Sequence, residues 1–183
     1  NTPDESENAP AFGGDVLAYL SDDTKEDETQ VFAMNAAGGK ARQVTHIKGG
    51  VSDFTLSPDG RTIIAVAEVG PSVGADPEKP RPIVVDRFHF KEDHRGYIDD
   101  RRLQLFRVDT ATGEAEQITA GAADYYSPSW SPDGSQIAYV TAQTEHEDRN
   151  YNYDVFVMAP QKGANPRKVS DYAGADADPE LGY

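Results

Sequence analysis

Two stretches of the sequence decide the fold: Phe54-Thr-Leu-Ser-Pro-Asp-Gly-Arg-Thr-Ile-Ile-Ala-Val66 and Trp130-Ser-Pro-Asp-Gly-Ser-Gln-Ile-Ala-Tyr-Val140. In both, Ser-Pro-Asp-Gly separates two short apolar segments. The proline presets φ, the aspartate can bond to the turn backbone, and the glycine accepts a positive φ. Each stretch therefore predicts two antiparallel strands joined by a tight turn, with no reactive role for the turn itself.

A second pattern follows each of these stretches and also occurs once before them. It consists of an apolar strand, a glycine and a short strand. The apolar strands are Gln30-Val-Phe-Ala-Met-Asn35, Gln104-Leu-Phe-Arg-Val-Asp109 and Asp154-Val-Phe-Val-Met-Ala159, and the short ones are Arg42-Gln-Val-Thr45, Glu116-Gln-Ile-Thr119 and Arg167-Lys-Val-Ser170. The sequence therefore predicts a repeated unit of four antiparallel strands, a to d, with the Ser-Pro-Asp-Gly turn between a and b.

This repeat predicts an all-β fold, a partial β-propeller of about three four-stranded antiparallel blades with almost no helix. Blade one spans about 9–45, blade two 51–119 with an insertion at 70–101, and blade three 125–170; residues 177–183 resemble the start of a fourth. Propellers usually close with about four to eight blades. Two explanations stay open: the chain is a segment of a larger propeller, or two copies associate into a closed six-bladed ring.

The aromatic residues Phe12, Phe54 and Trp130 fall at similar places in the three predicted a strands. We expect all three to be buried between neighbouring blades, because large aromatic side chains contribute most when packed in a core.

Composition excludes several classes of function. The chain has no cysteine, which excludes disulfides and cysteine-based zinc sites, and its formal net charge of −15 disfavours nucleic-acid and anionic-membrane partners. No apolar run is long enough to span a bilayer, and no targeting signal is visible at the acidic N-terminus. No cofactor is expected, and the compartment stays undetermined.

The Ser-Pro-Asp-Gly hairpins resemble the WD40-like repeats of TolB-type propellers and of the N-terminal propellers of prolyl oligopeptidase family (S9) serine peptidases. The insertion favours the peptidases, since Pro82-Ile-Val-Val-Asp-Arg-Phe-His-Phe-Lys-Glu-Asp-His-Arg-Gly-Tyr-Ile-Asp99 and Arg102-Leu-Gln-Leu-Phe106 are similar to a segment of acylaminoacyl-peptidase-like and dipeptidyl-peptidase-like enzymes.

That resemblance implies a catalytic α/β-hydrolase domain, which this sequence does not contain, as the partner of the propeller. It also implies that the propeller restricts access of peptide substrates, and it slightly favours the cytoplasm. The alternative is a TolB-like protein-binding scaffold, which would be periplasmic.

The residues themselves offer no catalytic site. Gly70-Pro-Ser-Val-Gly74 matches the nucleophile-elbow pattern, but prolines follow Ser72 where an elbow needs a helix. The four histidines lack zinc-site spacing, so no metal is expected.

The insertion carries the candidate contact residues. Between Lys79 and Arg107 there are 8 basic and 5 acidic residues in an otherwise strongly acidic chain. Arg87, Arg101 and Arg102 are the residues that we expect to contact a hydrolase domain or a substrate, because guanidinium groups bind carboxylates through two hydrogen bonds. The alternative left open is pairing with the adjacent Asp86, Asp99 and Asp100.

Overall fold

The computed structural model describes residues 6–22, 24, 28–71, 73, 91–92, 96–97, 101–142, 152–170 and 174–181. The first sheet contains β1 (Glu7–Gly13), β2 (Val16–Ser21), β3 (Gln30–Asn35) and β4 (Arg42–Gln43). The second contains β5 (Asp53–Leu56), β6 (Thr62–Val69), β9 (Arg102–Asp109) and β10 (Ala115–Gln117). The third contains β11 (Tyr125–Trp130), β12 (Ile137–Thr141), β13 (Asp154–Met158) and β14 (Arg167–Lys168).

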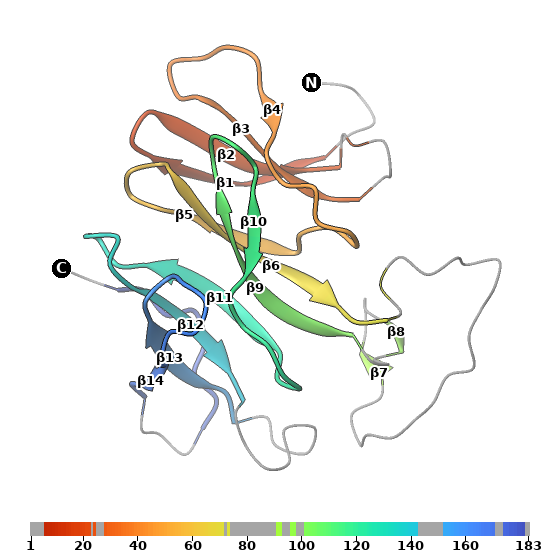
Figure 1. The fold of residues 1–183 in the computed structure, drawn as a ribbon, viewed down its shortest axis with the longest axis vertical. Helices are drawn as coiled ribbons and strands as arrows, with labels where there is room; N and C mark the ends of the chain where they lie inside the picture. Colours follow the sequence, from red (N-terminus) through yellow and green to blue (C-terminus); the bar gives the residue numbers. More distant parts are fainter. Residues whose placement is uncertain are drawn as a thin grey trace.

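These three sheets are stacked blades (Figure 1). Every strand pair within them is antiparallel, and the a strand of blade two, β5, contacts the a strands β1 and β11 of its two neighbours. A separate two-stranded sheet, β7 (Lys91–Glu92) and β8 (Gly96–Tyr97), lies within the insertion. The described residues contain no helix, and hence none that could cross a membrane. The all-β, three-blade prediction is confirmed.

The Ser-Pro-Asp-Gly turns are held by their own side chains, as predicted. In the turn between β5 and β6, the Ser57 hydroxyl donates to Asp59 Oδ1 at 2.6 Å and accepts the Thr62 N–H at 2.9 Å. Asp59 Oδ1 also accepts the Arg61 N–H, and Gly60 has a φ of 74°. Since both the hydroxyl and the carboxylate bond to the turn, neither is available as a reactive group.

In blade one, Gly13 and Gly14 stand in place of this turn, and their close contact with blade two explains why glycines are needed there. Gly13 packs so closely on the second blade that a Cβ atom there would overlap the Ser57 carbonyl oxygen, and a Cβ on Gly60 would overlap the Gly13 carbonyl oxygen. The Gly14 N–H donates to Pro58 O at 2.9 Å. The turns of blades one and two therefore fit together only without side chains at Gly13 and Gly60.

Two apolar cores lie between the three sheets, one at each interface between neighbouring blades. The core between blades one and two contains mainly buried aliphatic residues from both sheets, together with Phe54: Ala18, Leu20, Val31, Ala33, Phe54, Leu56, Ile63, Ala65, Ala67 and Val108 among others. The core between blades two and three contains a larger share of aromatic residues: Ile64, Val66, Leu105, Ile118, Tyr125, Ile137, Tyr139, Phe156 and Met158 among others. Alternate residues of β6 belong to different cores, as expected for a strand covered on both faces.

A buried polar relay joins strands c and d of blade two. The Thr119 hydroxyl accepts the N–H of Leu105 at 2.8 Å and donates to Gln104 Oε1 at 2.8 Å. Gln104 Nε2 donates in turn to Ala123 O at 2.9 Å, in the connection to blade three. All the polar atoms of this buried group are therefore satisfied, and the relay sets where the chain leaves one blade for the next.

Blade one repeats the whole relay, and blade three repeats part of it. In blade one the Thr45 hydroxyl accepts the Val31 N–H and donates to Gln30 Oε1, and Gln30 Nε2 donates to Ile47 O at 2.7 Å. In blade three the hydroxyl is that of Ser170, which accepts the Val155 N–H at 2.9 Å. There Asp154 stands in place of the glutamine and forms an ion pair of 2.7 Å with Lys168.

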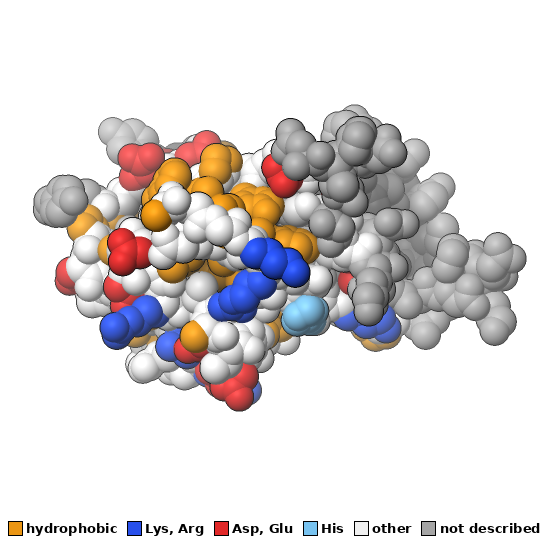
Figure 2. All heavy atoms as spheres, turned by 90° about the horizontal axis from the view of Figure 1, so that it is seen from above, with side chains coloured by type: hydrophobic (Ala, Val, Ile, Leu, Met, Phe, Trp, Pro, Cys, Tyr) orange, Lys and Arg blue, Asp and Glu red, His pale blue; other side chains and the backbone are white. Residues whose placement is uncertain are grey.

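The expected burial of the three aromatic residues is only partly right. Phe54 is buried, Trp130 is half-buried, and Phe12 is 69% exposed. Strand register explains the difference, because Phe12 pairs with Leu17 and lies on the face of blade one that is turned away from blade two. Figure 2 shows hydrophobic side chains gathered on this outer face, to which Tyr19 and Phe32 contribute a stacked pair.

Removing these aromatic side chains tests the packing. Trp130→Ala should lower the free energy of unfolding by about 2 kcal/mol, less than the roughly 3–5 kcal/mol of a fully buried tryptophan, because the indole is half-buried. Phe12→Ala is the matched control and should change it by less than about 0.5 kcal/mol. Urea unfolding of the two variants measures both values, and equal losses would contradict the assigned register.

Candidate functional site

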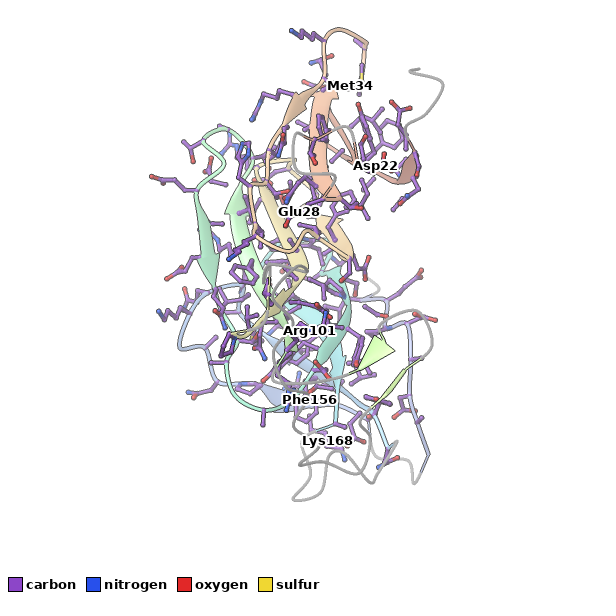
Figure 3. All side chains as sticks on the ribbon, turned by 90° about the vertical axis from the view of Figure 1, so that its right-hand side faces the viewer. Asp22, Glu28, Met34, Arg101, Phe156 and Lys168 are labelled. Atoms are coloured by element: carbon purple, nitrogen blue, oxygen red, sulfur yellow. The ribbon has the colours of Figure 1, made fainter. Side chains whose placement is uncertain are left out.

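The site that the sequence predicted is at the end of the blades opposite the Ser-Pro-Asp-Gly turns. The insertion leaves blade two at Val69, the last residue of β6, and the chain re-enters the sheet at Arg101 and Arg102. Figure 3 looks onto this end, where Arg101 lies in the central part of the view. Arg87 and the acidic residues Asp86, Asp99 and Asp100 lie outside the described residues, so their predicted contacts stay predictions.

Arg101 forms an ion pair with Glu68 across the sheet. Its Nη1 lies 3.1 Å from Glu68 Oε2, and the two side chains are only 26% and 21% exposed. Glu68 is near the end of β6, opposite Leu103 in the β6–β9 pairing. The ion pair therefore links β6 to the residue that precedes β9, at the end of the sheet where the insertion leaves and returns.

Arg102 binds backbone carbonyl groups. Its Nε donates to Ala122 O at 2.7 Å, and its Nη1 donates to Arg101 O at 2.7 Å. The neighbouring Leu103 N–H donates to Asp124 Oδ1 at 2.6 Å. Because Ala122 and Asp124 belong to the connection between β10 and β11, these bonds tie the re-entry of the insertion to the start of blade three.

At the opposite end of the blades, the Ser-Pro-Asp-Gly turns carry aspartates whose carboxylates are stabilised in the ionised form. Hydrogen bonds from the Ser131 hydroxyl and from Ser135 lower the pKa of Asp133 to about 2, and a hydrogen bond from Ser57 lowers the pKa of Asp59. Both turn carboxylates therefore stay ionised at ordinary pH. A cleft of about 470 Å³ lies between the two turns, where Trp130 and Arg107 are part of its lining.

The described residues hold no arrangement suited to nucleophilic catalysis. The serine hydroxyls of both turns are bonded to aspartates, as described for Ser57, and Ser131 donates to Asp133 Oδ1 at 2.7 Å. His46 is the one described histidine, and its Nδ1 lies 3.1 Å from Gln43 Nε2. Ser72 and the other three histidines lie outside the described residues. Within the described ranges, no group of three or more metal-binding side chains comes together.

A double-mutant cycle tests the ion pair. Arg101→Ala and Glu68→Ala should each lower the free energy of unfolding, and the coupling between them should be about 1 kcal/mol, because the pair is partly shielded from solvent. Chemical denaturation of the two single variants and the double variant gives this coupling. A coupling indistinguishable from zero would show that the pair contributes nothing to the sheet.

Comparison with known proteins agrees with the motifs. No family model matches the sequence. The chain is 32% identical over 151 residues to the uncharacterized peptidase YuxL of Bacillus subtilis, covering 79% of this chain and 23% of that protein. The chain thus spans about a quarter of the length of this relative.

Solved structures share the fold. A structure of acylaminoacyl peptidase in complex with Z-Gly-Gly-Phe-chloromethyl ketone aligns with a TM-score of 0.66 at 17% identity, over 90% of this chain and 25% of that one. TolB from Acinetobacter baumannii aligns with a TM-score of 0.60 at 15% identity, over 97% of this chain and 35% of that one. Together with the sequence relationship, these comparisons confirm the predicted resemblance: the chain is a partial β-propeller similar to the propellers of the prolyl oligopeptidase family (S9) of serine peptidases.

Proposed function

We propose that this chain is a non-catalytic propeller segment of an S9-type serine peptidase, in which it lies beside a catalytic α/β-hydrolase domain and restricts access of peptides to the active site. The observation that carries the proposal is the 32% identity to a curated peptidase over most of this chain. The hydrolase domain would supply the serine, histidine and aspartate for acyl transfer. The propeller would contribute shape and charge at the entrance.

The insertion end is the part of the segment that we assign to this role. Long loops on a rigid scaffold commonly carry function, and the segment from Lys79 to Arg107, which includes most of the insertion, holds 8 of the 17 basic residues of an acidic chain. The ion pair and the carbonyl contacts of Arg101 and Arg102 fix the base of the insertion on blade two. In this proposal Arg87, further along the insertion, contacts carboxylates of the hydrolase domain or of the substrate.

Charge reversals in the full-length protein test this assignment. Arg87→Glu should raise KM for a peptide substrate on the order of tenfold, because one charge-assisted hydrogen bond contributes about 1.5 kcal/mol. The increase should be smaller at high salt, which screens exposed charges. Arg61→Glu is the matched control, since Arg61 is 85% exposed at the turn end, and it should leave KM unchanged.

A second pair of variants separates contact from local structure. The double variant Glu68→Arg with Arg101→Glu keeps an ion pair at the base of the insertion but exchanges the positions of its positive and negative charges. A KM that changes while the unfolding transition stays in place supports a contact at this end. If Arg87→Glu and the exchanged pair both leave KM and its salt dependence at the parental values, the proposed contact is wrong.

The second candidate function is a TolB-like protein-binding scaffold, which the structural similarity to TolB favours. The sequence that follows Tyr183 in the intact protein distinguishes the two. A Gly-x-Ser-x-Gly elbow between a strand and a helix supports the peptidase, whereas a chain that ends after further blades supports the scaffold. Self-association into a six-bladed ring stays a prediction, which sedimentation of this chain tests directly.

A further inference from the structure

The two interfaces between blades differ at the turn end of the stack. Between blades one and two, a Cβ atom on Gly60 would overlap the Gly13 carbonyl oxygen, whereas between blades two and three a Cβ on Gly134 would lie 3.9 Å from Pro58 Cδ, an ordinary contact. The cleft of about 470 Å³ lies at this second, more open interface. The repeat alone therefore does not explain the cleft, which depends on what differs between the two interfaces.

Two equivalent positions carry different side chains at the two interfaces. Leu56 and Ala33, which are buried in the core between blades one and two, correspond in strand pairing to Trp130 and Arg107. The second interface therefore has a tryptophan and an arginine where the first has a leucine and an alanine. A charged side chain at a core position costs stability unless it is paired, so a residue of this kind points to a role beyond the packing of the blades.

The guanidinium group of Arg107 is available to a ligand. Leu105 belongs to the core between blades two and three, so Arg107, two residues further along β9, faces the same side. Arg107 is half-buried, and its side chain forms no hydrogen bond or ion pair with any residue that the structure describes. Asp109, the next residue on that side of the strand, uses its Oδ1 for N–H groups of the turn that follows.

Two aspartates lie at the edge of the same cleft. Asp59 and Asp133 are exposed, and the Oδ1 atom of each accepts a serine hydroxyl and a backbone N–H of its own turn. The Oδ2 atom of Asp133 takes part in none of these turn bonds. The cleft thus combines one positive group on its wall with two negative groups at its edge.

The remaining walls are apolar and rigid. Pro58, Pro132 and Pro160 line the cleft together with Trp130, and each proline ring fixes its own φ. Trp130 Nε1 donates to Thr55 O at 3.4 Å, which holds the indole against blade two. Walls of this kind need little rearrangement when a ligand binds.

We propose that this cleft binds a peptide carboxylate, which pairs with Arg107, while a basic residue next to that carboxylate meets Asp59 and Asp133. A guanidinium group binds a carboxylate through two hydrogen bonds. The two aspartates would repel a phosphate group more strongly, because it carries more negative charge. The walls of Trp130 and the prolines suit an apolar side chain of the peptide.

The carboxylate can belong to the end of a chain or to an acidic side chain, and the experiment below separates these two sources. The inference does not rest on the proposed function, because the cleft is at the end of the blades opposite the insertion.

Trp130 is the one tryptophan of the sequence, so its fluorescence reports on the cleft directly. The 183-residue chain is titrated with acetyl-Ala-Lys-Leu, with the C-terminal amide of the same peptide, and with acetyl-Ala-Lys-Asp amide. The free acid should change the fluorescence saturably, and its amide should bind about tenfold more weakly or less, because it lacks the charge-assisted hydrogen bonds. Binding of the aspartate peptide as tight as that of the free acid assigns the site to any peptide carboxylate, and binding of the free acid alone assigns it to a chain terminus.

Variants test the assigned residues. Arg107→Met keeps an unbranched side chain in the cleft without its charge and should weaken binding of the free acid by about tenfold or more. Arg167→Met removes an exposed arginine of blade three and is the matched control, which should leave Kd unchanged. Asp59→Asn with Asp133→Asn keeps an oxygen for each turn but removes both charges, so it should weaken the lysine peptide and strengthen binding of acetyl-Ala-Glu-Leu. Urea unfolding at or above the parental midpoint shows that the variants are folded.

Any of three results would overturn the inference. The first is neither a fluorescence change nor a heat of binding at millimolar free acid. The second is an equal Kd for the free acid and its amide, and the third is an unchanged Kd in Arg107→Met.

Discussion

Strand β6 must be covered on both of its faces, and the arrangement of the blades follows from that constraint. Ile63, Ala65 and Ala67 face blade one, whereas Ile64 and Val66 face blade three, and all five are at most 1% exposed. A sheet that is apolar on both faces cannot leave either of them in water without losing about 25 cal/mol for each Å² of apolar surface. Blade two is therefore complete only between two neighbours, and the two cores have to form together.

Side-chain hydrogen bonds hold the connections through which the chain passes from one blade to the next. The relay of Gln104 and Thr119 joins strands c and d and reaches the connection to blade three. Arg102 and Asp124 bond the same connection from the insertion side. The end of the molecule that we assign to substrate or domain contact is thus built on a junction that side chains from both blade two and the connection to blade three hold by hydrogen bonds.

Much of the fold could be predicted because its signals are local. The proline, aspartate and glycine of each turn act within a few residues, and the alternation of apolar residues along β6 and β12 is visible without a structure. The relay left a signal as well, since Gln30 and Thr45 are separated by the same number of residues as Gln104 and Thr119.

What could not be predicted depends on register and on distant partners. The exposure of Phe12 follows from its pairing with Leu17, which places it on the outer face. Arg101 forms an ion pair with Glu68, 33 residues earlier in the chain, whereas the sequence suggested contact with another domain or a substrate, or alternatively pairing with the aspartates beside it.

The dependence of each blade on its neighbours is tested most directly by native-state hydrogen exchange of the Ile64→Ala variant. Ile64 faces only blade three, and its truncation should cost about 3 kcal/mol. If the two cores form together, the slowest-exchanging amides of β2 in blade one and of β12 in blade three lose the same opening free energy. A loss confined to β12, with β2 unchanged, would show that the blades unfold separately and would contradict the account.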